Sequence, residues 1–381
     1  MAMFQNGESN YSIVGATTSI SPTTFSYGNS TFDYIEEPEG ALKRLFDAYH
    51  PIHGYLAPVI CVLGIIANCL NIVVLTRKNM ISPTNVLLTW LAISDGLTMM
   101  AYLPFVILNY HIYKGEPSPL SNARFIMFFA IFSVVVHSIS IWLTVSLAVF
   151  RYVFIRYPRR GAKLCSTYRA KLTVFIVCVV VTMVCIPNSV SYEFKNSGSG
   201  NTTSWFIEIK SDTPGFQFLK NFNLWIQGIL LKLLPCLLLA ILSILLIKQM
   251  KDAEKRRKKL MNKNSSKLED DSRRHRKTNR TTRMLVVVVV LFVLTETPQG
   301  ILQLLGGIIE SFFMKVYSPL GDILDILALF NNGINFVLYC TMSKQFRDTF
   351  IKIFLSDIVK ATSIRSETQL MTARTTRVSE V

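Results

Sequence analysis

The sequence predicts an all-α membrane protein, a seven-transmembrane-helix bundle with a short amphipathic cytoplasmic helix after the last span. Half of the 381 residues are apolar, and they fall in blocks of roughly 20 residues or more, the length that a helix needs to cross a hydrocarbon core. The formal net charge of +16 is concentrated in the connections on one side of these blocks. Polar triplets typical of glycosylated segments lie on the other side. Together these patterns indicate a multi-pass membrane protein.

Residues 1–50 are expected to form a disordered extracellular tail, because they are rich in Ser, Thr, Asn and Gly. They contain no apolar core of a cleavable signal peptide, so the first span is expected to insert on its own. Asn10 and Asn29 each begin an Asn-X-Ser/Thr triplet, and Asn201 begins another between the fourth and fifth spans. These three asparagines are predicted to carry glycans if they face outward.

The membrane domain is expected to cover residues 51–342. Its predicted spans are residues 56–77, 84–110, 123–156, 170–190, 222–250, 281–312 and 319–342. The valine run at 286–290 favours a strand, but an open strand cannot cross lipid with unpaired backbone groups, so a helix is predicted there. The seventh span is the least hydrophobic of the set, since it holds two aspartates and three asparagines.

The charge of the loops predicts the orientation. Basic residues flank the connection between the third and fourth spans and fill the connection between the fifth and sixth, a predicted third cytoplasmic loop at about 249–280. By the positive-inside rule these connections are cytoplasmic, and the N-terminus is then outside, at the plasma membrane. Next to membrane spans, a basic cluster indicates a cytoplasmic loop beside lipid, and nucleic acid is excluded as a partner.

Residues 343–355 are predicted to form a helix along the cytoplasmic interface. Phe346, Phe350 and Phe354 are spaced four apart with basic residues between them, a pattern that suits a helix lying at the membrane surface. Residues 356–381 are polar and rich in Ser and Thr, so a disordered cytoplasmic tail open to kinases is expected.

Enzymatic and transport functions find little support in the sequence. The seven cysteines have no metal-ligand or redox spacing, and the spans hold no pair of a nucleophile and a base. A transporter would be expected to show repeat-related halves with broken helices, and neither is visible. We therefore predict a protein that is not an enzyme and needs no cofactor, apart from an ion considered below.

Polar side chains in the third span recur on one helical face. Ser133, His137, Ser140, Thr144 and Arg151 follow at steps of four, three, four and seven, which places all five on the face that must point inward. Ser133 and Thr144 could equally serve as hydrogen-bonding contacts between helices. Arg151, at the cytoplasmic rim, favours a functional role.

A second polar set combines residues from four spans. Asp95 is its single acid, and neutral oxygens from Asn68, Ser140, Asn331 and Asn335 are expected around it. Such a group suits a small hard cation such as sodium. A hydrated hydrogen-bond network without an ion is the alternative.

A third polar set lies in the outer half of the sixth span. Glu296, Gln299 and Gln303 surround Pro298, and Asp325 of the seventh span is expected at a similar depth. Pro298 frees a carbonyl group and kinks its helix, which gives the span a pivot. The two glutamines could also serve only to join neighbouring helices.

These residues carry a family resemblance. From about residue 50 to residue 355 the chain resembles rhodopsin-like G-protein-coupled receptors, with one motif of that family on each of six spans, in the family's order. The matching residues are Asn68, Asp95, Arg151-Tyr152 with Pro158, Leu234-Pro235, Phe292 with Pro298, and Asn335 with Tyr339. The resemblance implies coupling to a heterotrimeric G protein through Arg151, Tyr152, Pro158 and Tyr339.

Departures from the common pattern indicate a subfamily. Phe150, Glu296 and Phe336 replace the usual acid, tryptophan and proline. With these changes, residues 138–145, 295–302 and 334–339 resemble invertebrate receptors for myosuppressin and related FMRFamide-type peptides, of which the sex peptide receptor is a relative. The resemblance implies a secreted Arg-Phe-amide peptide as ligand, an inhibitory G protein, and arrestin at the tail. The expected ligand contacts are Ser133, His137, Glu296, Gln299, Gln303 and Asp325.

Two further departures concern stability and the resting state. Most of the family joins the third span to the second outer loop by a disulfide, but neither residues 123–128 nor residues 191–221 contain a cysteine. How that loop is held stays open. The acids that usually restrain the arginine of the third span are replaced by Phe150 and Thr278. A rhodopsin-like receptor for another class of ligand is the main alternative, but an amine is disfavoured because Ser133 stands where amine receptors carry an acid.

Overall fold

The computed structural model describes residues 40–113, 118–197, 204–210, 214–261, 287, 289–306, 308–309 and 312–355. In this part of the chain, seven helices are long and apolar enough to cross a membrane, which confirms the predicted seven-helix bundle. They are Leu42–Leu75, Pro83–Ile112, Leu120–Arg156, Thr167–Val190, Ile226–Gln249, Val289–Gly306 and Lys315–Met342. Many apolar side chains on them remain exposed, such as Phe175 at 65%, as expected of helices that face lipid.

The first helix is longer than expected. α1 (Ala41–Leu75) begins well before residue 56, so residues 41–50 are helix and the predicted tail of residues 1–50 is too long at its C-terminal end. The polar residues of this first part hid the helix, because they do not belong to the apolar block that defines the span. His50 and His53 lie on the added turns, and both take part in the contacts described below.

The next spans follow the predicted ranges closely. α2 (Pro83–Val106) continues as the π-helix η2 (Ile107–Ile112), and α3 (Leu120–Arg156) and α5 (Thr167–Val190) follow. Short elements connect them: the 3₁₀ turn η1 (Lys78–Met80) and α4 (Pro158–Leu164). Serine side chains cap α2 and α5, since the hydroxyls of Ser82 and Ser166 accept the amide N–H three residues on.

The fifth span is a continuous helix with a π-helical segment. α6 (Pro214–Trp225) leads into η3 (Ile226–Leu233), and η3 leads into α7 (Leu234–Met261). The sixth span is described as helix from Val289 to Gly306, and at residues 287, 289 and 290 of the valine run the expected helix is confirmed. The π-turn η4 (Phe313–Tyr317) precedes α9 (Ser318–Met342).

An antiparallel hairpin joins the fourth and fifth spans and was not expected. Its strands are β1 (Tyr192–Ser197) and β2 (Ser204–Ile209), paired in a register that places Phe194 opposite Ile207. The described structure ends with α10 (Lys344–Phe354), the amphipathic helix predicted after the last span. Phe346 of α10 is buried and packs against Phe336 and Tyr339 of α9.

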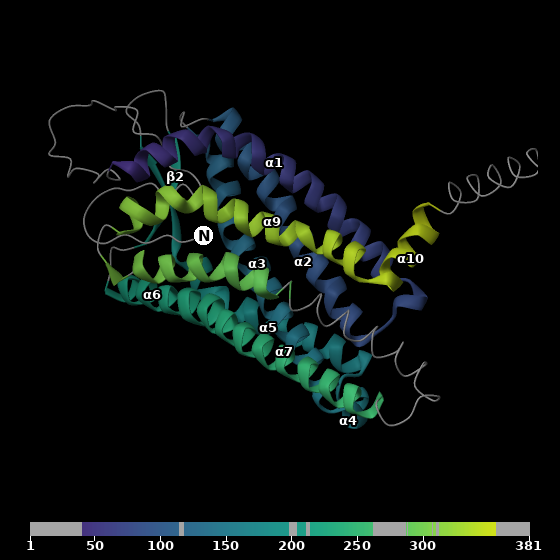
Figure 1. Cartoon of the computed structure of the whole chain (residues 1–381). Coiled ribbons are helices and arrows are strands. Elements are labelled where there is room, and N and C mark those ends of the chain that lie inside the picture. Colours follow the sequence, from purple (N-terminus) through teal and green to yellow (C-terminus); the bar gives the residue numbers. More distant parts are fainter. Residues whose placement is uncertain are drawn as a thin grey trace, which may run out of the picture.

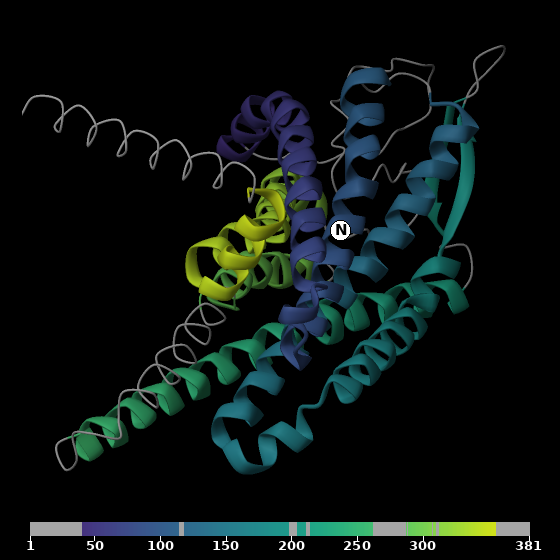
Figure 2. The ribbon, with the colours of Figure 1, turned by 90° about the vertical axis from the view of Figure 1, so that its right-hand side faces the viewer.

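The helices run side by side, with the hairpin at one end of the bundle and α4 and α10 at the other (Figure 1). We call these the hairpin end and the α10 end. α1 lies against α2 and α9, and α3 contacts α2, α5 and α7. Figure 2 shows α10 turning away from the axis of α9. The core between the helices contains several apolar clusters and an unusual number of polar side chains.

Candidate functional site

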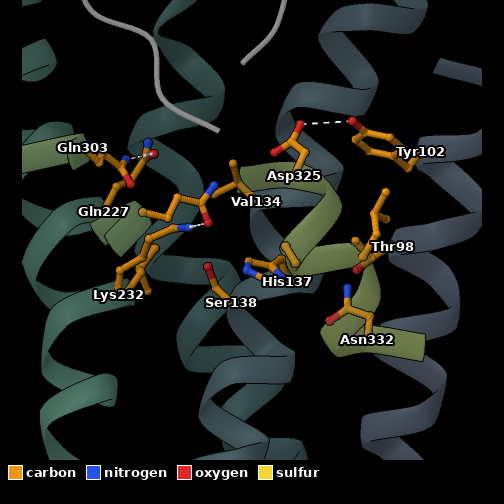
Figure 3. A pocket seen from close by; sticks show the side chains of 14 residues that line it. Thr98, Tyr102, Val134, His137, Ser138, Gln227, Lys232, Gln303, Asp325 and Asn332 are labelled. Carbon is orange, nitrogen blue, oxygen red and sulfur yellow. Dashed lines mark hydrogen bonds between the residues drawn. The ribbon is translucent and has the colours of Figure 1, made fainter. Parts of the chain in front are cut away.

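A cavity lies between α2, α3, η3, the Val289–Gly306 helix and α9, in the half of the bundle toward the hairpin end. It comprises about 580 Å³ of space not filled by atoms, part of which is open to the surroundings of the bundle. Figure 3 shows the side chains that line it. They are Thr98, Tyr102, Val134, His137, Ser138, Gln227, Leu231, Lys232, Gln299, Gln303, Asp325, Ala328, Leu329 and Asn332. A mostly apolar cavity with a few convergent polar groups is the usual form of a small-ligand site.

One wall carries Gln227 and Lys232, and the helix type explains how both reach the cavity. Residues five apart on an α-helix are separated by about 140° around the axis. In η3, however, the π-helical pattern has i to i+5 hydrogen bonds, which brings such residues close to the same face. Gln227 and Lys232 are both buried there, at 8% and 7% exposure. The π-helix therefore supplies a buried cation to the site.

Lys232 forms a buried cluster with the sixth helix and α3. Its Nζ donates to Gln299 Oε1 at 2.5 Å and lies 3.5 Å from Glu296 Oε2. The same carboxylate oxygen is 3.1 Å from Nε2 of His137. Gly300 permits this approach, since a Cβ there would lie only 3.3 Å from Cβ of Lys232. The cluster joins three spans, and its two residues on the sixth helix, Glu296 and Gln299, lie on either side of Pro298.

Glu296 therefore does not face the ligand cavity as expected. The side chain is fully buried and does not line the cavity. Its negative charge is already opposed by Lys232, with His137 as a second partner. The expectation that Glu296 contacts the ligand is thus corrected, because Lys232 of the same chain is paired with its carboxylate. Lys232 is the residue that sequence reasoning missed.

The opposite wall of the cavity carries Asp325, whose carboxylate, unlike that of Glu296, is hydrogen-bonded to a neutral side chain. The hydroxyl of Tyr102 donates to Asp325 Oδ2 at 3.1 Å, and Nε2 of His53 lies 3.0 Å from the same hydroxyl. Within the described residues, no lysine, arginine or histidine is close enough to form an ion pair with Asp325. Figure 3 shows Asp325 and Tyr102 across the cavity from Gln303, Gln227 and Lys232. Among the described residues, Asp325 is therefore the acid that lines this cavity without an ion-pair partner.

Asp322, one turn before Asp325, is already engaged. Its Oδ2 lies 2.8 Å from Nδ1 of His50, and its Oδ1 accepts a hydrogen bond from the Tyr110 hydroxyl at 2.7 Å. These contacts tie α1 and η2 to α9. Asp322 does not line the cavity, which leaves Asp325 as the acid that a ligand can reach.

The remaining residues of the expected ligand site divide into two groups. His137, Gln299, Gln303 and Asp325 line the cavity as expected. Ser133 does not: it is fully buried, and its hydroxyl donates to the Phe129 carbonyl of its own helix.

The three asparagines that are expected to carry glycans lie outside the described residues. They are Asn10, Asn29 and Asn201.

The expected cation group around Asp95 comes together in part. Ser140 donates to one carboxylate oxygen, and Nδ2 of Asn335 donates to the other at 3.0 Å. Asn68 donates to the Asn332 carbonyl, and its own Oδ1 is buried without a hydrogen-bond partner in the described structure. Asn331 is buried, but no hydrogen bond joins it to Asp95 among the described side chains. The oxygen donors that are present suit a small hard cation.

The α10 end carries the residues expected to couple to a G protein. Arg151 is half-buried on α3, and its Nε is buried without a hydrogen-bond partner in the described residues. The neighbouring Phe150 packs on the apolar cluster of α2, α3 and α5. Tyr152 follows, Pro158 begins α4, and Tyr339 is buried against α10. Thr278, the other expected neighbour of Arg151, lies outside the described residues.

The hairpin is anchored to α3 without a disulfide, and all seven cysteines are free. The backbone N–H of Trp205 donates to the Ser118 carbonyl at 2.9 Å, and the Ser204 hydroxyl accepts from the N–H of Ser118 at 3.2 Å. Ile207 is buried against Ile126 of α3. This arrangement answers how the loop is held at the mouth of the bundle.

Comparison with known proteins shows where such a bundle belongs. Residues 55–357 match the family described as serpentine type 7TM GPCR chemoreceptor Srw. The match covers most of the chain, from within the first span through the other six spans and α10.

Individual relatives show similar agreement. The chain is 31% identical to the G-protein coupled receptor dmsr-1 of Caenorhabditis elegans, over 84% of this chain and 72% of that protein. It is 30% identical to the sex peptide receptor of Drosophila melanogaster, over 87% of this chain and 83% of the receptor. It is also 27% identical to the FMRFamide receptor of Drosophila melanogaster, over 79% of this chain and 53% of that receptor.

Proposed function

The chain belongs to the family of serpentine seven-transmembrane G-protein-coupled receptors, and on that premise we propose that it is a cell-surface receptor for a short amidated neuropeptide. The peptide is of the FMRFamide or myosuppressin type and ends in Arg-Phe-amide. Two kinds of support agree: the similarity to the sex peptide and FMRFamide receptors, and the chemistry of the cavity. In this proposal the hairpin end faces the outside of the plasma membrane.

Asp325 is the single observation that carries the proposed ligand chemistry. It is 7% exposed, lines the cavity, and receives one hydrogen bond from a neutral tyrosine. An ionised carboxylate in such a place is costly unless it is paired. The guanidinium of the peptide's arginine supplies that pair through charge-assisted hydrogen bonds. Lys232 on the opposite wall is already paired with Glu296, so Asp325 is the charged group of this cavity that is left to bind the guanidinium.

Signalling follows from a shift in population between two states. The bound peptide favours a state in which the sixth span has swung outward about Pro298, and a cleft opens beside Arg151 at the α10 end. A heterotrimeric G protein of the inhibitory type enters this cleft. Kinases and arrestin then act on residues 356–381, which lie outside the described structure. A sodium ion at Asp95, Ser140 and Asn335 stabilises the resting state.

The proposal is tested in cells that express the receptor, with calcium and cyclic-AMP readouts against a panel of amidated peptides. We expect at least one peptide ending in Arg-Phe-amide to act at low concentration, and pertussis toxin to block the fall in cyclic AMP. A response to a ligand of another class, with none to the amidated panel, would overturn the assignment in favour of a receptor for that class.

The arginine contact has its own test, which replaces arginine by citrulline in the active peptide. Citrulline keeps the shape and removes the charge. In the native receptor this change is expected to weaken the response about tenfold or more, or about 1.4 kcal/mol. Asp325→Asn should abolish the difference between the two peptides. Glu296→Gln is the matched control and should preserve the difference, because Glu296 does not line the cavity. Full discrimination in Asp325→Asn would refute the pairing.

A further inference from the structure

A chain of side-chain hydrogen bonds runs from the hairpin to the cavity. The hydroxyl of Tyr192 in β1 donates to Asn188 Oδ1 at the end of α5, at 3.3 Å. Nε2 of Gln227 in η3 donates to the same oxygen at 2.8 Å. Nε2 of Gln303 on the sixth helix then donates to Gln227 Oε1 at 3.4 Å. All four residues are buried, so four separate elements are held together by polar groups.

The series of hydrogen bonds ends at the side-chain oxygen of Gln303, which accepts no hydrogen bond in the described structure. Gln303 is 1% exposed and lines the cavity, and its Oε1 has no hydrogen-bond partner in the described part of the chain. Buried polar atoms nearly always have a partner, so an acceptor without one, on a residue that lines a ligand cavity, indicates a donor on the ligand. Gln299 differs in this respect, because its Oε1 already accepts from Lys232.

We propose that Gln303 Oε1 binds the N–H group of the ligand's terminal primary carboxamide. A primary carboxamide carries two N–H donors, whereas a free carboxylate carries none and would bring an oxygen against the oxygen of Gln303. The ammonium of Lys232 has three N–H donors, two of which point toward Gln299 and Glu296. Its third donor is available to the carbonyl oxygen of the carboxamide.

The charges of the same wall also favour a neutral terminus. Lys232 lies beside Glu296, so the positive charge that would attract a free carboxylate is already opposed within the chain. The cavity then has two poles: Asp325 for a cation and Gln303 with Lys232 for a carboxamide. This inference rests on the proposed function, since it assigns one end of an amidated peptide to a named atom.

The experiment compares two probes, Phe-Met-Arg-Phe-amide and the same tetrapeptide with a free carboxylate. The readout is the ratio of their affinities in competition binding to cells that express each variant. We expect the native receptor to prefer the amide at least tenfold. Gln303→Leu removes the acceptor and should reduce that preference about tenfold, because the amide loses its hydrogen bond and the carboxylate no longer meets the oxygen of Gln303. Gln303→Glu keeps an acceptor and should keep the preference.

Gln299→Leu is the matched control on the same helix. Because the oxygen of Gln299 is used by Lys232, its loss should weaken both probes alike and leave the ratio unchanged. Surface labelling confirms that each variant reaches the membrane. If Gln303→Leu does not reach it, the binding ratio of Gln303→Glu provides the test.

The possible failures are distinguishable. An unchanged ratio in Gln303→Leu, or a lost preference in Gln303→Glu, would overturn the inference and leave the peptide-receptor proposal intact. Equal affinities of the two probes in the native receptor would overturn it as well. Binding of neither probe, with no response to the amidated panel, would overturn the proposed function and the inference together.

Discussion

Removal of the buried cation in η3 is the perturbation with the largest expected effect on stability. Lys232→Met keeps most of the apolar stem and deletes the charge, so Glu296 stays buried with His137 as its remaining partner. Glu296 is fully buried and Lys232 is 7% exposed. Removing one partner of a buried ion pair typically costs about 3–5 kcal/mol, because the other charge is left uncompensated.

That estimate agrees with the geometry. Two unit charges 3.5 Å apart attract by about 5 kcal/mol at an effective dielectric constant of about 20. With an unfolding entropy of about 2.1 cal/mol/K per residue, a loss of 1 kcal/mol lowers the unfolding temperature of a chain of 381 residues by roughly 1 °C. Thermal unfolding of the purified receptor in detergent should therefore show a fall of about 4–6 °C.

The double variant separates the charge effect from simple loss of packing. Lys232→Met combined with Glu296→Gln leaves no unpaired charge, so it should recover much of the stability that either single change loses. Lys195→Met is a matched control, because Lys195 pairs with Glu208 in the hairpin at 2.7 Å but is a third exposed. Such a pair contributes about 0–1 kcal/mol. Additive losses in the double variant would refute the reasoning.

Three further outcomes are expected. A glycosidase should lower the apparent mass of the cell-expressed protein, and an N-terminal tag that is labelled only after permeabilisation would contradict the topology. Peptide binding in intact cells should survive millimolar reductant, because all seven cysteines are free and there is no disulfide to break; a loss reversed by reoxidation would contradict this account. The receptor should signal without ligand, and Phe150→Asp should lower that basal signal by giving Arg151 an ionic partner. Unchanged basal signalling at equal surface expression would count against it.

The fold was largely predictable because lipid imposes a simple rule. A span needs about 20 apolar residues, so α2, α3, α5 and α9 begin within a few residues of their expected positions. The start of α1 was not predictable in this way, because Lys43, Arg44 and Asp47 interrupt the apolar residues of this segment and α1 extends beyond the apolar block. The hairpin did leave a signal: Glu193 and Lys195 alternate with Tyr192 and Phe194, a period of two that is typical of a strand.

The site was predictable only where helical spacing was regular. Gln299 and Gln303 lie four apart on an α-helix, and both reach the cavity. Lys232 was missed although a lysine within an apolar span is costly and therefore informative. Its relation to Gln227 could not be inferred from α-helical spacing, because only the π-helix brings both to one face. The pairing of Glu296 depended on that same lysine.

The contacts that hold the hairpin against the start of α3, which we call the clasp, affect how fast a ligand can enter the cavity. Two hydrogen bonds to Ser118 hold it, each worth about 1 kcal/mol net, and burial of Ile207 contributes about 2 kcal/mol. A total near 4 kcal/mol corresponds to an open population on the order of one in a thousand. A covalent tie would have no such population under oxidising conditions. We therefore expect the hairpin to separate from α3 reversibly in a small fraction of molecules, and the rate of peptide entry to rise with temperature as the clasp weakens.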